Sequence, residues 1–418
     1  MKKKLLLILI ISIPLSLIGQ ETRLWKKSAF TITPEVLTGI TAPANDGFPE
    51  TDLHKQLLIT LGRNHKNNPQ EWAQRIKGLR TGIGFGISDF GNLDSLGVAI
   101  TVIPQIQFNA FGSERFSVTT GMGASYFTKN YDPITNPNNR AVTTDYTWAF
   151  RLFLNYNFLK TQSLDWNIGI GYSHHSNGHT KLDNQGYNSF LLSLSAAINN
   201  PFKISEENIP IPKKIVEHSS YSYFTLRGGL GWNVLALAFN DNREVYSFSA
   251  EYGKVYNNTW KVGLGLNYRF YEHYYDYING NESLVQHGRE FEDFKEHPVW
   301  NASNISVAIN GEVLLNHVGI AVQIGYNFHK PGYKIDYRIN EGWDNTPREI
   351  PESWMLGEFN TKFKLKHRIS SRIGAKYYFI GTTKQPQHNI FIGAHLNSNL
   401  GQADFSEVSF GYVYNFGN

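Results

Sequence analysis

The segment Trp260-Lys-Val-Gly-Leu-Gly-Leu-Asn-Tyr-Arg-Phe270 decides the fold, because its apolar and polar residues alternate without a break. Successive side chains of a β-strand point to opposite faces, so this strand has one apolar face and one small or polar face. A length of about ten residues crosses a bilayer at the tilt of a barrel strand. The segment therefore predicts a transmembrane β-strand whose aromatic ends lie at the membrane boundaries.

The same alternation recurs along the chain and predicts an all-β fold. It is clear over 146–158, where Phe153 is the one exception, over 318–328 and over 408–416. Taken together, the segments predict one antiparallel transmembrane β-barrel of about 14 strands, within a range of about 12 to 16. The further candidate strands are 29–40, 80–90, 96–110, 116–128, 164–176, 188–198, 221–235, 244–256, 304–314, 357–367, 371–380 and 388–397.

The first residues predict export from the cytoplasm. Three lysines follow Met1, an apolar run extends to Ile18, and Gly19 supplies a small residue, which is typical of a cleaved signal peptide over 1–19. A retained membrane anchor is the alternative. We expect 20–79 to hold N-terminal strands and a short helix or plug near Trp72, and 80–418 to form the barrel.

Composition and connections agree with a membrane barrel. The chain has no cysteine, which excludes disulfides and a thiol nucleophile, and its formal charge of +4 is too small to indicate a nucleic-acid partner. Long polar connections at 272–303 and 329–355 are expected on the extracellular side, and the short turn at 257–258 on the periplasmic side. The connection at 200–219 is long where such a barrel needs only a short turn.

A cluster of polar residues lies in the stretch GYSHHSNGH at 171–179. His174 and Ser176 are two residues apart on a strand, so they share a face, and the imidazole can act as general base for the hydroxyl. Asn177 and Gly178 begin a turn whose backbone N–H groups could hold an oxyanion. The spacing alone favours a polar loop base without chemistry, and a serine hydrolase site is the alternative that the residue types allow.

The same alternation predicts where these side chains point. His174 and Ser176 continue the apolar, lipid-facing side of their strand, and Asn188 lies on the lipid-facing side of the next one. Polar groups on that surface are costly unless they have a function there. We expect Ser173 and His175 to point into the barrel. A metal site of His174, His175 and His179 is disfavoured, because neighbouring residues on a strand face opposite ways.

The string HHSNG at 174–178, with NQGYN at 184–188 after it, resembles the lipid A 3-O-deacylase (PagL) family of outer-membrane barrels. Further similar features upstream extend the likeness over roughly 70–200 and resemble the longer acyloxyacyl hydrolase members. These features are Trp72, the GIGFG strand at 82–86, FGN at 90–92, LG at 96–97, YD at 131–132 and NPNN at 136–139.

The resemblance implies an outer-membrane esterase in which His174 is the base, Ser176 the nucleophile and Asn177 with Gly178 the oxyanion region. Asn188 stands where the family pattern has a glutamate, and we expect it to orient His174 as a third catalytic residue. The chain is longer than the compact eight-stranded members, which implies a wider barrel or one with a plug.

The predicted function is therefore hydrolysis of an ester-linked acyl chain of lipid A in lipopolysaccharide, without a cofactor or metal. Expected partners are lipid A as substrate, the surrounding outer-membrane lipid, and the barrel-assembly machinery, which recognises a C-terminal strand such as the one near Phe416. No nucleic-acid partner is expected. The alternative is a passive porin, motivated by the inward-facing Arg151, Lys261 and Arg269.

Overall fold

The structure, a computed structural model, describes residues 29–44, 47–161, 163–203, 214–340 and 361–417. The predicted signal peptide at 1–19 lies outside these ranges. Among the helices inside them, none combines the length and the apolar composition that a membrane crossing requires.

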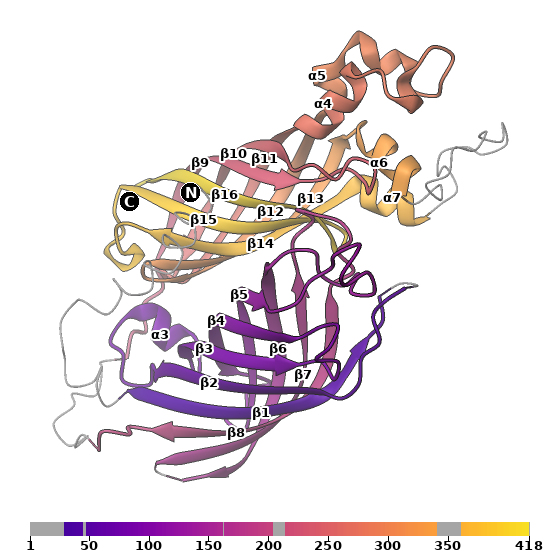
Figure 1. Cartoon of the computed structure of the whole chain (residues 1–418). Helices are drawn as coiled ribbons and strands as arrows, with labels where there is room; N and C mark the ends of the chain where they lie inside the picture. Colours follow the sequence, from indigo (N-terminus) through magenta and orange to yellow (C-terminus); the bar gives the residue numbers. More distant parts are fainter. Residues whose placement is uncertain (1–28, 45–46, 162, 204–213, 341–360, 418) are drawn as a thin grey trace.

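The strands form two closed antiparallel barrels of eight strands each, which lie side by side (Figure 1). The first barrel closes through β1 and β8, and the second closes through β9 and β16. The first comprises β1 (Phe30–Ala42), β2 (His54–Asn64), β3 (Arg80–Asp89), β4 (Val98–Asn109), β5 (Phe116–Phe127), β6 (Tyr146–Lys160), β7 (Leu164–Ser176) and β8 (Tyr187–Asn199). The second comprises β9 (Ser220–Asn233), β10 (Arg243–Tyr256), β11 (Trp260–Tyr271), β12 (Ser303–Leu315), β13 (Val318–His329), β14 (Ile369–Tyr378), β15 (His388–Asn399) and β16 (Gln402–Asn415).

Short helices lie in the connections between strands. Figure 1 shows α4 to α7 gathered at one end of the second barrel, which we call the helical end. The predicted long connections at 272–303 and 329–355 begin there, and the turn at 257–258 lies at the opposite end. The helices are α3 (Glu71–Arg75), α4 (Glu272–Asn279), η1 (Ser283–Val285), η2 (Glu292–Glu296), α5 (Pro298–Asn301), α6 (Tyr333–Asn340), α7 (Thr361–Arg368) and η3 (Thr382–Lys384).

The prediction of one barrel over 80–418 was wrong. The first barrel already begins at β1 and β2, and the chain passes to the second barrel through the connection at 200–219, which explains its length. Alternation shows which face of a strand meets lipid, but it does not show which strand closes the sheet. The closing pairs, such as Glu35 with Ser195, join residues far apart in sequence.

Two strand assignments also differ from the prediction. Residues 361–367 of the expected strand at 357–367 form α7, where Phe363 packs against Tyr333 and Tyr337 of α6. Conversely, β2 was not among the candidate strands. Its Leu58 points into the barrel and interrupts the alternation that would have revealed the strand.

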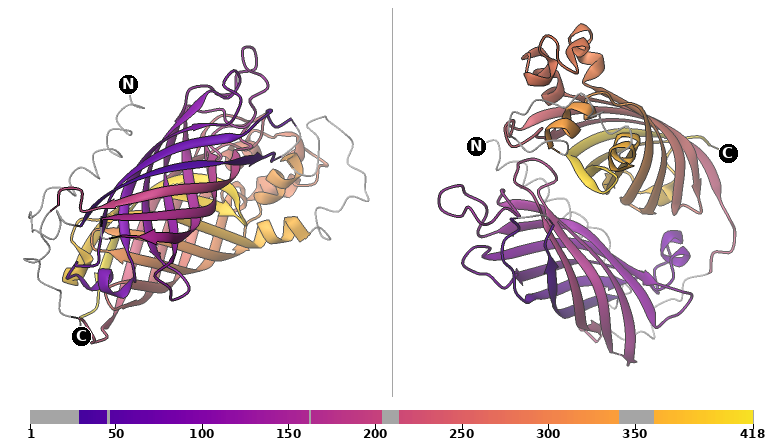
Figure 2. Two further views of the ribbon diagram at one scale, coloured as in Figure 1. Left: turned by 90° about the horizontal axis from the view of Figure 1, so that it is seen from below. Right: turned by 90° about the vertical axis from the view of Figure 1, so that its right-hand side faces the viewer.

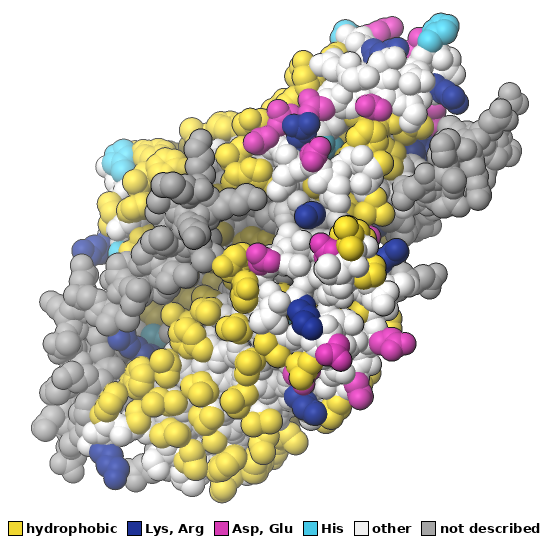
Figure 3. Space-filling model, in the orientation of Figure 1, with side chains coloured by type: hydrophobic (Ala, Val, Ile, Leu, Met, Phe, Trp, Pro, Cys, Tyr) yellow, Lys and Arg dark blue, Asp and Glu magenta, His cyan; other side chains and the backbone are white. Residues whose placement is uncertain are grey.

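The outer walls of both barrels are apolar. Ile170 in the first barrel is 62% exposed, and Leu264 in the second is 69% exposed. Figure 3 shows hydrophobic side chains spread over the outer wall of the first barrel. Exposed apolar bands of this extent are what a bilayer stabilises and water does not.

The interior of the first barrel combines one apolar layer with many buried polar side chains, most of them small serines, threonines and asparagines. Eight strands leave a lumen just wide enough for side chains to fill. The ion pair between Arg151 and Glu35, 2.8 Å apart, lies beside this apolar layer. The layer consists of Leu37, Leu58, Ile103, Ala149, Phe153 and Leu191. Phe153 was the single exception to the alternation in β6, and its place in this inward-facing layer explains that exception.

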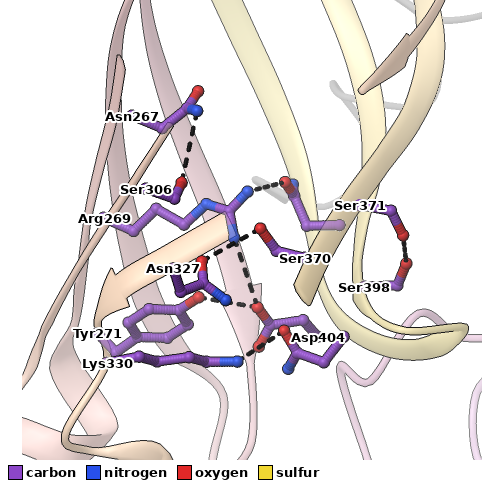
Figure 4. A network of polar contacts seen from close by, with 12 residues as sticks. Asn267, Arg269, Tyr271, Ser306, Asn327, Lys330, Ser370, Ser371, Ser398 and Asp404 are labelled. Carbon is purple, nitrogen blue, oxygen red and sulfur yellow. Dashed lines mark hydrogen bonds and ion pairs between the residues drawn. The ribbon is translucent and has the colours of Figure 1, made fainter. Parts of the chain in front are cut away.

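The interior of the second barrel holds a network of buried charged side chains beside an apolar layer around Tyr223 and Phe391. Arg227 pairs with Glu407, and Lys376 lies 2.7 Å from Glu312. Toward the helical end, Arg269 and Tyr271 both approach Asp404 (Figure 4). Buried charges are retained in a low-dielectric interior only when they are paired in this way.

The two barrels touch through α3, which is the helix expected near Trp72. Trp72 and Ile76 pack with Leu315 of the second barrel and with the outward-facing Ile106 and Phe108 of β4. Figure 2 shows the barrels from two further sides as neighbouring but separately closed bodies. The helix therefore lies outside the first barrel and is not a plug.

Candidate active site

The polar cluster lies where β6, β7 and β8 approach the helical end of the molecule. In the β-sheet register, His174 of β7 stands opposite Asn188 of β8, and Ser176 stands opposite Trp148 of β6. Three neighbouring strands thus bring these four side chains into one area. The chain folds this way locally because the loop 177–186 joins β7 to β8 as an antiparallel pair.

The side chains alternate in direction along β7, as their sequence pattern predicts. Ile168 and Ile170 are exposed on the outer wall, and His174 continues their side. Ser173 and His175 are buried inside, where His175 Nδ1 lies 3.1 Å from Ser125 Oγ. His174 therefore lies on the outside of the first barrel.

Asn188 holds the imidazole of His174. Its Oδ1 lies 2.8 Å from His174 Nδ1 and accepts a second hydrogen bond, 2.6 Å long, from the hydroxyl of Tyr172. An amide oxygen is only an acceptor, so the proton of the neutral imidazole lies on Nδ1. The lone pair is then on Nε2, the tautomer that a general base requires.

Ser176 receives two hydrogen bonds from the following loop. Its Oγ accepts one from the backbone N–H of Gly178 at 3.2 Å and one from Asn184 Nδ2 at 2.9 Å. Ser176 is only 4% exposed although it lies on the outer side of β7. Two donors thus surround the hydroxyl oxygen of the candidate nucleophile.

The serine and the histidine border the same small space. A Cβ atom added at Gly186 would lie 3.1 Å from His174 Cε1 and 3.6 Å from Ser176 Cβ. Gly186 also has a φ of +69°, so a glycine is required there on both counts. Within the described residues no hydrogen bond joins His174 directly to Ser176.

Of the two residues predicted for the oxyanion region, Gly178 directs its backbone N–H at Ser176 Oγ and Asn177 does not. The N–H of Gly178 points toward Ser176, but the N–H of Asn177 donates to Asn184 Oδ1 at 3.0 Å. Asn184 supplies the second donor and was not predicted for this role. The signal that could have identified it is its place in the string NQGYN, which carried the family resemblance.

Other candidates from the loop lie apart from this arrangement. Asp183, the acidic residue nearest the site in sequence, lies 3.9 Å from Arg140. Partial burial raises the pKa of the Asp183 carboxyl, and Arg140 opposes that rise. The carbonyl of His179 accepts a hydrogen bond from Val234. The described chain contains no cluster of three or more residues suited to hold a metal ion.

Comparison with known proteins agrees with this arrangement of domains. Residues 52–197 match the sequence profile of lipid A 3-O-deacylase (PagL), and residues 219–339 match that of the acyloxyacyl hydrolase C-terminal domain. The chain belongs to the PagL and acyloxyacyl hydrolase family. The PagL match runs from just before β2 into β8 of the first barrel. The C-terminal match begins at β9 of the second barrel and ends in α6.

Several solved structures are similar to parts of this protein. The crystal structure of the outer membrane enzyme PagL is 14% identical, covers 39% of this chain and 97% of its own, and has a TM-score of 0.28. OccK5 (OpdH) of Pseudomonas aeruginosa is 8% identical, covers 94% of this chain and 99% of its own, and has a TM-score of 0.20. The search of curated proteins gives no match.

Proposed function

We propose that this protein is an outer-membrane serine esterase that removes an ester-linked acyl chain from lipid A, with Ser176 as nucleophile and His174 as general base. The observation that carries the proposal is that both residues are held by hydrogen bonds from neighbouring groups. Asn188 fixes the tautomer of His174, and two donors surround Ser176 Oγ. A serine hydrolase needs both an oriented base and a donor pair near the nucleophile.

The reaction follows from the positions of these groups. His174 Nε2 takes the proton of the Ser176 hydroxyl as Oγ attacks the ester carbonyl carbon. The carbonyl oxygen becomes an oxyanion, and in this proposal Gly178 N–H and Asn184 Nδ2, which donate to Ser176 Oγ in the resting site, donate to the oxyanion instead. The imidazolium then protonates the departing sugar alcohol, which leaves an acyl-enzyme. A water molecule, deprotonated by His174, hydrolyses that ester and releases the fatty acid.

In this proposal Asn188 is the third catalytic residue and orients His174. An uncharged amide oxygen can orient a catalytic histidine, as it does in Cys-His-Asn sites, although it stabilises the imidazolium less than a carboxylate does. The double contact of Asn188 with His174 and Tyr172 supports this role.

The outward position of the site suits a substrate that is itself a membrane lipid. Ile170 and Leu152 continue the outer wall beside the cluster and are more than half exposed. An acyl chain lying along this apolar wall would bring its ester bond to the polar residues at the end of β7. The match to lipid A 3-O-deacylase names the substrate class. Integration in the outer membrane and recognition of the strand ending near Phe416 by the barrel-assembly machinery belong to the same proposal.

A porin function has less support. Its motivating residues Arg151, Lys261 and Arg269 do face inward, but each is buried in an ion pair within a filled lumen. Eight-stranded barrels of this kind are packed cores and not aqueous channels.

The test is release of fatty acid from lipid A in mixed micelles by the purified protein, followed by mass spectrometry of the remaining lipid. We expect wild type to release an acyl chain and Ser176→Ala to release none above background. The matched control is Ser173→Ala, which removes a buried serine on the inner face of the same strand. Equal release by wild type and Ser176→Ala would overturn the assignment of the nucleophile.

A further inference from the structure

The loop that carries the proposed oxyanion donors is held in place by the second barrel. Ser406 of β16 accepts a hydrogen bond from Trp148 Nε1 at 2.8 Å and donates one to the carbonyl oxygen of Gly178 at 3.4 Å. Trp148 stands opposite Ser176 in the sheet, and the N–H of Gly178 points at Ser176. One serine on the outer wall of the second barrel thus contacts both sides of the site in the first.

A second contact holds the same loop further along. Leu182 N–H donates to Asn240 Oδ1 at 2.8 Å, and Asn240 Nδ2 donates to the carbonyl oxygen of Leu182. In addition, Val234 N–H donates to the carbonyl oxygen of His179 at 3.1 Å. Asn240 and Val234 both lie in the connection between β9 and β10. The segment 178–182 is therefore bonded at three residues to the second barrel.

The backbone of this segment is shaped for that contact. Gly178 and His179 have φ angles of +68° and +67°, a region that non-glycine residues rarely adopt because of backbone strain. A Cβ atom at Gly178 would lie 2.2 Å from Ser406 Oγ and 2.9 Å from Leu396 Cδ1, so only glycine lets β15 and β16 approach this closely. The conformation that aims the Gly178 N–H depends on bonds from outside the first barrel.

We infer that the C-terminal barrel is a positioning domain for the catalytic loop, and that Ser406 and Asn240 are its positioning residues. Neither touches the reacting atoms. Each fixes the segment that directs a donor at Ser176 and so raises the rate of the chemical step. The inference rests on the proposed esterase function, because it assigns a role to the second barrel in that same reaction.

The experiment measures kcat and KM for fatty-acid release in the full-length protein and in the variants Ser406→Ala and Asn240→Ala. Each variant removes contacts worth about 1 kcal/mol, so kcat should fall about 3- to 10-fold, and the double variant should lose more. KM should change little, because neither residue contacts the lipid. The rate of labelling of Ser176 by a fluorophosphonate should fall in parallel, and Ser406→Thr, which keeps the hydroxyl, should restore it.

The control is Ser222→Ala, which removes an outward-facing serine of β9 far from Gly178 and should leave kcat unchanged. Heat-dependent gel mobility reports the folded fraction of every variant, and rates are expressed per folded protein. An active wild type with unchanged kcat and labelling in both Ser406→Ala and Asn240→Ala would overturn the positioning role alone. A wild type that neither releases fatty acid nor reacts with the fluorophosphonate would overturn the esterase proposal, and the positioning role with it.

Discussion

The two barrels have the same strand number and closure, yet they fill their interiors differently. In the first, the layer around Phe153 is apolar, and the pair Arg151 and Glu35 is the ion pair beside it. In the second, Arg227 with Glu407 and Lys376 with Glu312 belong to a network of buried charges. A lumen of this size must be filled, but the backbone does not dictate with what.

Their outer walls differ in a way that bears on function. At the helical end, the outer wall of the first barrel carries His174 and a serine surrounded by donors, whereas that of the second offers Ser406 as a partner for its neighbour. Two barrels with the same strand number therefore present different side chains at the same end of the molecule. Under the proposed function, the first barrel performs the chemistry at its surface and the second provides a rigid frame beside it.

The largest expected contrast between the barrels concerns catalysis. His174→Ala should lower kcat by about 10³-fold or more, because it removes the base of a nucleophile–base unit while leaving the barrel wall intact. His388→Ala, which removes an exposed histidine of β15 in the second barrel, should leave kcat as in wild type. Fatty-acid release by the folded variants measures both. Comparable rates in the two variants would mean that His174 is not the base.

The next contrast concerns stability. Glu407→Ala leaves Arg227 buried without its partner and should cost about 3–5 kcal/mol of unfolding free energy. Glu35→Ala should cost less, because Glu35 accepts its hydrogen bonds from Arg151, whereas Glu407 also accepts hydrogen bonds from Ser247 and Asn397. Urea unfolding of both variants from lipid vesicles gives the two values. A larger loss for Glu35→Ala would contradict the view that the second barrel depends more on its buried charges.

A smaller effect is expected where the site departs from the family pattern. Asn188→Ala removes the acceptor of His174 Nδ1 and should lower kcat about 10- to 100-fold. Asn188→Glu restores the family's carboxylate at that position and should keep or raise the rate, since a charge stabilises the imidazolium. The measurement is kcat for all three forms under one set of conditions. If Asn188→Ala equals wild type, another residue orients the histidine.

The smallest predicted effect lies at the contact between the barrels. Trp148→Phe keeps the ring against the site but removes the N–H that bonds Ser406. We expect a loss of about 2- to 5-fold in kcat, since a single neutral hydrogen bond is involved and Ser406 still reaches Gly178. Phe158→Leu, near the other end of the same strand and exposed on its outside, serves as the control. An unchanged kcat in Trp148→Phe would mean that the hydrogen bonds of Asn240, and not the one between Trp148 and Ser406, hold the loop in position.

Local patterns in the sequence are enough to predict the strand type and the direction of the site residues. Alternation with a period of two is a local property, so β7 and β11 could be identified, and His174 could be separated from His175, without a structure. The resemblance carried by residues 174–188 likewise indicated the family.

The closure of the strands and the surroundings of Ser176 depend on contacts between segments that are distant in sequence. Pairing of β1 with β8 joins residues more than a hundred positions apart, and no local pattern encodes which edge meets which. The hydrogen bond from Asn184 to Ser176 and the contact of Ser406 with Gly178 depend on how a loop and a second barrel fold back onto β7. Such contacts arise from the packing of distant segments, and the sequence pattern of a strand records only the two faces that the strand presents.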